Sequence, residues 1–277
     1  MKNILVPIDF SENADKALTA AKEIASKTGA NLTILHAYQP YVADISIPVS
    51  ESSLPIYEEM ENSYKTQFDG YVDTAINEGY EAIGMWETDG IHSAILRQAK
   101  EIDADLIVVG RTGRGGFVDK LIGSSATDIA LDAKCPVLII PPQVGAISFR
   151  KVVYATQLEY EETDILREVL DLVKKLNADL SFVKISTLEQ PNIQSDNQYI
   201  EQMTNVLGIP ASDIVVRKGG SVLDGIEDYC DEVKADLLVV STRERGFLER
   251  YIINPSITKK LVVDTHVPLL VYHMKGN

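Results

Sequence analysis

Short apolar runs alternate along the chain with segments whose apolar residues recur every three or four positions. The runs are typical of buried parallel strands, and the segments between them of amphipathic helices that cover a sheet. In the first half the pattern predicts strands at Lys2–Ile8, Asn31–Ala37, Glu81–Trp86, Ala104–Gly110 and Pro136–Pro141. It predicts helices at Ser11–Thr28, Leu54–Glu78, Ile91–Glu101 and Ser124–Ala133. This alternation predicts a doubly wound α/β unit.

The second half repeats the order. Its predicted strands are Lys151–Thr156, Asp179–Ile185, Asp213–Arg217, Ala235–Ser241 and Pro268–Tyr272, and its helices are Glu161–Leu176, Asn197–Leu207, Ser221–Val233 and Ser256–Val263. The stretch ADLIVVG, ending at Gly110, matches ADLLVVS, ending at Ser241, and KCPVLII matches HVPLLVY. We therefore predict a tandem repeat of two five-stranded parallel-sheet domains.

The two repeats differ in length between their second and third strands. The first strands match at an offset of 148 and the fourth at 131, which leaves 17 extra residues in the first half, in or next to Tyr38–Glu59. The prolines and serines there predict a long loop before a longer helix. Such a loop could fold over a ligand, or it could be a surface elaboration or a contact with the other half.

Length and charge narrow the class of protein. A chain of 277 residues favours two domains, which we place at residues 1–145 and 146–277, with a linker near Pro142–Ser148. The net charge of -15 argues against a nucleic-acid partner. No segment is typical of a signal peptide or a membrane span, so we expect a cytoplasmic protein without a membrane partner. Cys135 and Cys230 have no metal-like spacing, and we expect them to fill core space.

The segment VVGRTGRGGFVDKLIGSSATDIA, Val108–Ala130, carries the candidate chemistry. Ligands of open parallel sheets bind beyond the carboxyl ends of strands where the strand order reverses, and Asp9 and Gly110 follow such strands. Gly110 and Gly113 let the backbone approach a ligand, and Thr112–Gly116 offers successive amides to an anion.

The end of the same segment suits phosphate oxygens. Gly123, Ser124 and Ser125 are predicted to begin a helix, where free N–H groups and two hydroxyls are available, and Arg111 and Arg114 add positive charge. The alternative is a glycine-rich loop followed by a serine N-cap, which needs no ligand.

These residues carry a family resemblance. The pattern Gly-x2-Gly-x9-Gly-Ser that closes on PVLIIP, together with ILVPIDFSE near the start, resembles the universal stress protein family. Two such units in one chain resemble its tandem form. The resemblance implies sheets in the strand order 3-2-1-4-5 and ATP, ADP or AMP bound between the first and fourth strands.

The resemblance also implies roles for individual residues. Asp9 would contact the adenosine part, and Ala37 would line the adenine pocket through its backbone. Gly110 and Gly113 would flank ribose and phosphates, while Gly123, Ser124 and Ser125 would hold the phosphate tail. Mg²⁺ would rely on phosphate oxygens, water and Asp9. The alternative for Asp9 is a carboxylate that stabilises the N-terminus of the next helix.

The second half lacks the residues of this motif. Ser241 stands at the Gly110 position, Glu244 at Gly113, Asn254 at Gly123 and Pro255 at Ser124, and the Asp9 position falls near Gln157. A carboxylate and a lost amide donor oppose phosphate binding, so we predict a retained fold without a nucleotide site. Family members commonly dimerise through the fifth strand, so PVLIIP and PLLVYH could pair within one chain as a pseudo-dimer, and two chains could form a homodimer.

Three functions remain open. The first is a nucleotide-binding regulatory protein of the stress response, with hydrolysis slow or absent and no catalytic residue. The second is an enzyme that hydrolyses ATP or transfers its adenylyl or phosphoryl group. The third is a scaffold that binds no nucleotide. The sequence contains neither the P-loop pattern nor a recognisable Ser-His-Asp arrangement.

Overall fold

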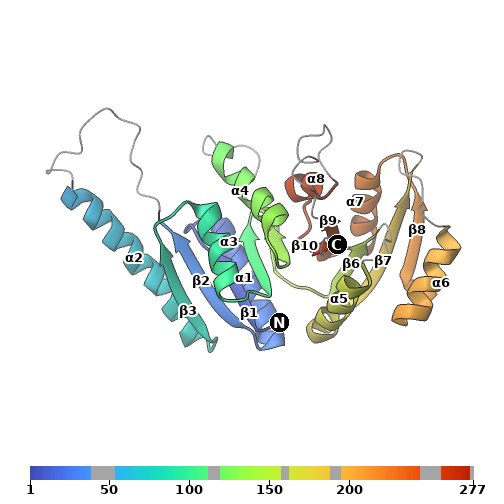
Figure 1. Cartoon of the computed structure of the whole chain (residues 1–277), viewed down its shortest axis with the longest axis horizontal. Coiled ribbons are helices and arrows are strands. Elements are labelled where there is room, and N and C mark those ends of the chain that lie inside the picture. The colour runs from blue at the N-terminus through green and yellow to red at the C-terminus, as the bar shows by residue number, and fades with distance from the viewer. Residues whose placement is uncertain (39–53, 112–118, 157–161, 188–194, 244–256, 275–277) are drawn as a thin grey trace.

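The computed structural model describes residues 1–38, 54–111, 119–156, 162–187, 195–243 and 257–274. Its strands join in one ten-stranded sheet, with helices on both faces (Figure 1). The strands are β1 (Asn3–Pro7), β2 (Asn31–Ala37), β3 (Ala82–Glu87), β4 (Leu106–Gly110), β5 (Val137–Ile140), β6 (Lys151–Ala155), β7 (Asp179–Ser186), β8 (Ile214–Lys218), β9 (Leu237–Arg243) and β10 (Leu269–Met274). The helices are α1 (Glu12–Thr28), α2 (Leu54–Asn77), α3 (Ile91–Glu101), α4 (Asp119–Asp132), α5 (Glu162–Leu176), α6 (Asp196–Leu207), α7 (Val222–Val233) and α8 (Ile257–Asp264), with a short 3-10 helix at Ala211–Asp213.

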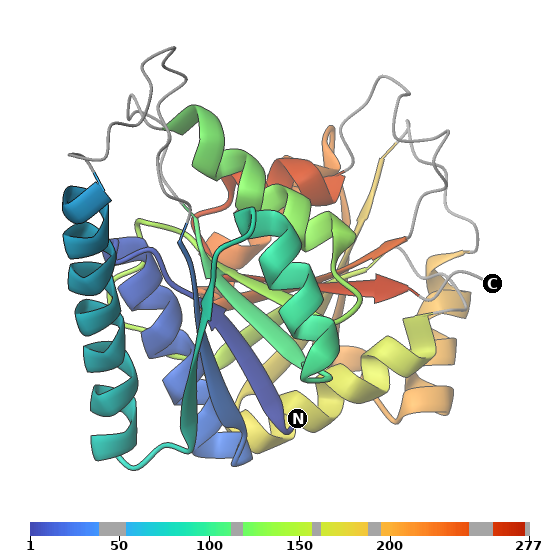
Figure 2. The ribbon, with the colours of Figure 1, turned by 60° about the vertical axis from the view of Figure 1, so that its left-hand side comes forward.

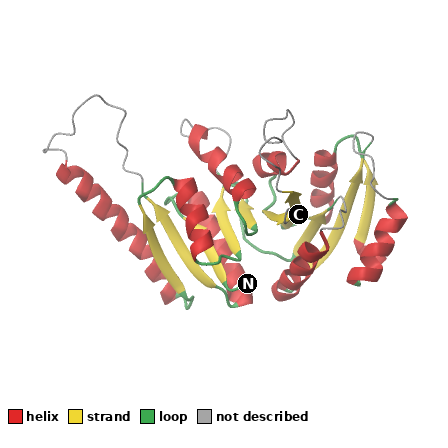
Figure 3. Ribbon diagram, viewed as in Figure 1, coloured by secondary structure: helices red, strands yellow, loops and turns green. Residues whose placement is uncertain are grey.

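The strand order contains the same five-strand pattern twice. It runs β3-β2-β1-β4-β5-β10-β9-β6-β7-β8, so each half has the expected order 3-2-1-4-5. Figure 3 shows these strands in yellow and the helices that cover them in red. Strands within each half pair in parallel, whereas β5 and β10 pair antiparallel with Leu138 opposite Leu270. The two fifth strands thus make the contact expected of them, and they merge the halves into a single sheet.

Two apolar cores lie on the two faces of this sheet. Ile4 and Val6 of β1 face the core under α1, α2, α5 and α6, while Leu5 between them faces the core under α3, α4, α7 and α8. Figure 2 shows α3 and α4 on one side of the first-half strands and α1 on the other. The strands are buried on both faces, which explains why they appear in the sequence as continuous apolar runs.

Local signals fix the helix ends. The Ser11 side chain accepts a hydrogen bond from the Ala14 backbone N–H and begins α1, and Gly29 ends that helix with φ 71°. Ser195 and Gln198 form a capping box at the start of α6. A serine at the N-cap is favourable because its side chain accepts a hydrogen bond from a free backbone N–H of the first turn. A glycine after the last turn is favourable because it adopts the left-handed conformation without strain.

The start of α4 differs from the prediction. The helix begins at Asp119 instead of Ser124, so the expectation that Gly123 and the two serines begin a helix is wrong. A helix tolerates one internal glycine at a cost of only about 1 kcal/mol. The amide groups of Gly123–Ser125 therefore fall within the second turn.

The extra residues of the first half lie where the repeat placed them, before β3. Part of the extra length is in α2, which has 24 residues where α6 has 12. The remainder of the expected loop, residues 39–53, lies outside the described residues. None of the helices in the described ranges is both long and apolar enough to cross a membrane. Cys135 and Cys230 are free thiols, the second of them buried.

Candidate functional site

Three of the expected site residues come together at the carboxyl edge of the first-half sheet. Asp9 follows β1, Ala37 ends β2 and Gly110 ends β4, and β1 lies between the other two strands. The chain leaves β1 through α1 toward β2 and returns through α3 to β4, so the strand order reverses beside β1. This edge is the place where open parallel sheets bind ligands.

Gly110 is in close backbone contact with the first turn of α1. A Cβ atom at Gly110 would overlap the Asn13 carbonyl oxygen and lie 3.0 Å from the Asn13 Cβ. Glycine is therefore required here by space rather than by a positive φ. The space that a side chain would need at the end of β4 is occupied by the first turn of α1.

The Asp9 carboxylate is exposed and lies at the start of α1. Its Oδ1 accepts hydrogen bonds from the Ser11 backbone N–H at 3.1 Å and from the Ser11 hydroxyl at 2.5 Å. This is the contact expected of a carboxylate that stabilises a helix N-terminus. Its other oxygen, Oδ2, accepts no hydrogen bond from the described part of the chain, so Asp9 retains an oxygen for a ligand.

Ala37 presents backbone groups past the end of β1. The Leu35 carbonyl accepts a hydrogen bond from the Ile8 N–H at 2.8 Å, so Leu35 faces β1. In a parallel strand the residue two positions further on faces the same side. The N–H and C=O of Ala37 therefore point toward the space beside Asp9.

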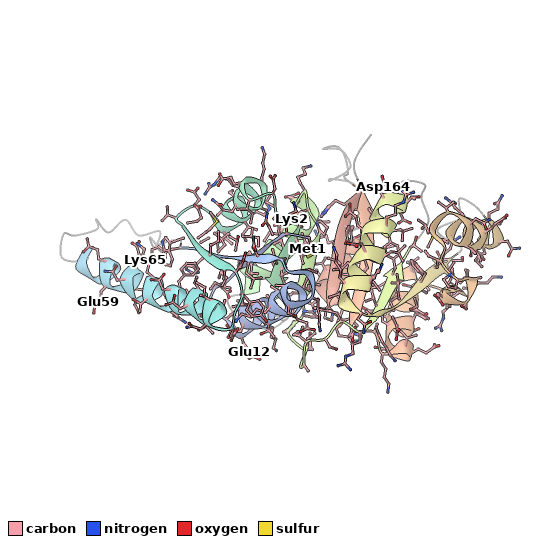
Figure 4. All side chains as sticks on the ribbon, turned by 90° about the horizontal axis from the view of Figure 1, so that it is seen from below. Met1, Lys2, Glu12, Glu59, Lys65 and Asp164 are labelled. Carbon is pink, nitrogen blue, oxygen red and sulfur yellow. The ribbon has the colours of Figure 1, made fainter. Side chains whose placement is uncertain are left out.

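An aromatic cluster that sequence reasoning missed supports this edge from the α2 face. Phe10 has φ 64°, which is rare for a bulky residue, and its ring lies 4.5 Å from the His36 ring and 5.8 Å from the Tyr64 ring. The Trp86 ring lies 4.8 Å from the His36 ring, and the Lys65 ammonium lies 5.5 Å from the Trp86 ring centre. Figure 4 shows Lys65 on α2. The sequence signal that could have indicated this cluster is the spacing of Tyr64, Phe68 and Tyr71, which places their side chains on one face of a helix.

His36 is held neutral within this cluster. Its Nδ1–H donates to the Ile8 carbonyl at 2.8 Å, and the side chain is buried. Burial lowers the pKa of His36 below its usual value, against smaller opposing effects of that hydrogen bond and of Asp9. The imidazole therefore acts as a structural link between β2 and the residue that follows β1.

Arg111 turns away from this edge toward the second half. Its side chain is 6 % exposed, and its guanidinium donates to the Val262 carbonyl at 2.8 Å and to the Thr265 carbonyl at 2.7 Å. Val262 lies in the last turn of α8, and Thr265 follows that helix. The Arg111 side chain, which was expected to add positive charge near the phosphates, contacts the C-terminal end of α8 in the structure.

The remaining expected residues are only partly described. Gly113 and Arg114 lie outside the described residues, and for Gly123, Ser124 and Ser125 the structure gives the backbone in α4 but no side-chain environment. In the described ranges no group of three or more His, Cys, Asp or Glu side chains is arranged to hold a metal ion.

The corresponding edge of the second half contains a buried carboxylate. Glu162, in the first turn of α5, is 2 % exposed and accepts hydrogen bonds from the Thr156 hydroxyl at 2.6 Å and from the Ser241 hydroxyl. Ser241 occupies the position of Gly110, and Glu162 that of Ala14. Through these two hydrogen bonds Glu162 links the end of β6 to β9 across this edge, where the first half has the smaller Ala14. Gln157, Glu244, Asn254 and Pro255 lie outside the described residues.

Comparison with known proteins assigns both halves. A Thermus aquaticus universal stress protein is 31% identical over 139 residues, which cover 50% of this chain and 98% of that protein. A Staphylococcus aureus (strain USA300) protein named as a candidate universal stress protein is 30% identical over 167 residues, covering 57% of this chain and 94% of its own length. A universal stress protein structure from Archaeoglobus fulgidus shares the fold along 99% of this chain and 98% of that one, with a TM-score of 0.73 at 18% identity. The family model described as the universal stress protein family matches residues 1–141 and again 148–273. The chain therefore belongs to the universal stress protein family, in its tandem two-domain form.

Proposed function

We propose that the first half binds an adenine nucleotide, ATP, ADP or AMP, and that the chain acts as a regulatory protein of the cytoplasmic stress response. The observation that carries this proposal is the exposed Asp9 carboxylate at the reversal of strand order, next to the end of β4 at Gly110. Open parallel sheets bind ligands at such an edge, and Asp9 offers a carboxylate oxygen to the hydroxyls of a sugar.

Different groups at this edge are proposed to bind the base, the ribose and the phosphates of the nucleotide. The Ala37 N–H and C=O suit the donor and acceptor pattern of a base, and Asp9 Oδ2 suits a ribose hydroxyl. Gly113, Arg114, Gly123, Ser124 and Ser125 are proposed to surround the phosphates. A Mg²⁺ ion bound with the phosphates would take oxygen ligands from them, from water and from Asp9, because this cation prefers hard oxygen donors.

The second half is proposed to serve as a permanent partner. Residues 1–145 and 146–277 form the proposed division, and the β5–β10 pairing replaces the contact that two separate chains would make. A further homodimer of whole chains is part of the same proposal. The buried Glu162 supports a second half without its own nucleotide site.

The test is direct identification of bound small molecules. Protein purified without added nucleotide is denatured, and the released compounds are identified by mass spectrometry, beside the variants Gly113→Glu and Gly145→Glu. Gly113→Glu copies Glu244 of the second half, whereas Gly145 lies in open space in the linker, so its variant makes the same chemical change away from the site. We expect nucleotide from the wild type and Gly145→Glu but not from Gly113→Glu.

Two results would contradict the proposal in different ways. A wild-type protein that releases no nucleotide and binds no added ATP, ADP or AMP in calorimetry would leave the scaffold function. Phosphate or pyrophosphate release from ATP that disappears in Asp9→Asn would favour the enzyme function.

A further inference from the structure

Both ends of the segment proposed to hold the phosphates are attached to the second half. At its beginning, the Arg111 guanidinium donates to the carbonyls of Val262 and Thr265 at the end of α8. At its end, the His273 Nε2–H of β10 donates to the Ala130 carbonyl in the last turn of α4 at 2.8 Å. Helices α4 and α8 also pack against each other (Figure 2).

The Arg111 contact has the features of a strong anchor. A guanidinium presents several donors in a fixed planar fork, and two of them reach two carbonyls of one helix end. The carbonyls at a helix C-terminus carry partial negative charge, so they favour a cation. The site is buried, which strengthens the interaction and makes its loss costly.

The chain geometry links this anchor to the proposed site. Arg111 directly follows Gly110, and the Arg111 backbone N–H donates to the Ile140 carbonyl of β5 at 2.8 Å. The backbone at Gly110 is therefore held by α1 on one side, by β5 through Arg111, and by α8 through the Arg111 side chain. A shift of α8 would move the end of β4, where the nucleotide is proposed to bind.

We infer that Arg111 is a positioning residue through which the second half controls phosphate binding in the first half. The Arg111 side chain stays on α8 and acts through the backbone at Gly110, rather than by contact with the nucleotide. Because coupling between two sites is reciprocal, a nucleotide held at this edge also stabilises α8. This inference rests on the proposed nucleotide site and assigns the second half a role in it.

The experiment uses the full chain and two readouts. Calorimetry measures the affinities for ATP and for adenosine, and hydrogen exchange followed by mass spectrometry measures the protection of α8 with and without ATP. The variants are Arg111→Met and Arg111→Lys, and the second keeps a cation at the same place. The control is Arg167→Met, which removes the same charge from an exposed position on α5.

We expect ATP to slow exchange in α8 of the wild type and of Arg167→Met. In Arg111→Met the affinity for ATP falls about tenfold, within the usual range of coupling between sites, and the protection of α8 by ATP disappears. The affinity for adenosine falls less than the affinity for ATP, because adenosine keeps the ribose contact at Gly110 but has no phosphate to position. The ATP affinity of Arg111→Lys lies between those of the wild type and Arg111→Met, because an ammonium keeps the charge but cannot reproduce the planar donor geometry of a guanidinium.

The outcomes separate this inference from the proposed function. A wild type that binds neither ATP nor adenosine would overturn the nucleotide site itself. Wild-type binding together with unchanged ATP affinity in both Arg111 variants would overturn the positioning role alone. Faster exchange of α8 with ATP would show that Arg111 leaves the helix to meet the phosphates, which also contradicts the inference.

Discussion

Gly110 and Asn13 are in contact backbone to backbone, so the end of β4 lies directly on the first turn of α1. No side chain fits between them, because a Cβ at Gly110 would overlap the Asn13 carbonyl oxygen. This contact brings the end of β4 and the Asp9–Ser11 turn to one edge of the sheet. Its removal is therefore a test of both stability and binding.

Gly110→Ala is expected to lower the free energy of unfolding by about 1–3 kcal/mol, the usual cost of overpacking. It should also weaken nucleotide binding, because α1 and β4 must separate. The matched control is Gly70→Ala in α2, where a Cβ meets nothing within 4 Å; there a gain of about 0.5–1 kcal/mol is expected for alanine in a helix. Urea denaturation followed by circular dichroism measures the free energy of unfolding of both variants. Equal stability of Gly110→Ala and wild type would show that the contact relaxes without cost.

Glu162→Ala is expected to destabilise the protein by about 1–3 kcal/mol, because it removes the acceptor of two hydrogen bonds in the interior. Glu168→Ala, an exposed change on the same helix, should stay within about 0.5 kcal/mol of wild type. Nucleotide binding to the first half is read in the same samples. If Glu162→Ala bound a second nucleotide, the Glu162 side chain alone would be what prevents nucleotide binding in the second half.

Stability is expected to fall as the pH falls below about 6.5, the ordinary pKa of histidine. The pKa of His36 is lowered by burial, so between its folded and unfolded values the unfolded chain binds more protons. The contribution of His36 is thus complete above pH 6.5 and is lost below it, with a slope of at most about 1.4 kcal/mol per pH unit. His36→Gln should flatten this part of the stability profile, whereas His266→Gln at an exposed position should leave it in place. An unchanged slope in His36→Gln would remove His36 as its source.

Residues 1–145 expressed alone are expected to dimerise, because β5 then becomes an exposed edge strand with apolar side chains on both faces. Light scattering of this fragment over a range of concentrations measures the association. A charged substitution, Leu138→Lys, replaces the residue opposite Leu270 and should keep the fragment monomeric if it remains folded. A folded wild-type fragment that stays monomeric would show that β5 does not drive pairing.

Neither thiol is expected to react with iodoacetamide in the folded protein at pH 8. Burial raises the pKa of Cys135 to about 11 and that of Cys230 to about 12, so almost no thiolate forms. Mass spectrometry after short exposure should find both cysteines unmodified, and both modified after unfolding in guanidinium chloride. Rapid labelling of Cys230 in native protein would indicate that α7 opens from the sheet.

The fold could be predicted closely because its strands are buried on both faces. Short apolar runs such as Leu106–Gly110, separated by amphipathic segments, predict buried parallel strands. The comparison of the two repeats also located the extra residues of the first half before β3. The start of α4 was missed because glycine followed by two serines is typical of a helix N-terminus, although one glycine is also tolerated inside a helix.

Long-range contacts of the candidate site could not be predicted. An arginine beside glycines suggests an anion site, and nothing local to Arg111 indicates a helix end about 150 positions later in the chain. The burial of Glu162 could not be predicted either, because a carboxylate in the first turn of a helix is usually solvated.

The antiparallel joint between β5 and β10 gives this chain a property that separate subunits lack. Each half meets its partner at the high local concentration set by a short linker, so pairing persists at any dilution in the cell. The partner can also never be exchanged for another family member. In a symmetric assembly of identical subunits a substitution appears in every subunit. In this chain a change such as the buried Glu162 is confined to one half and leaves the other half unchanged.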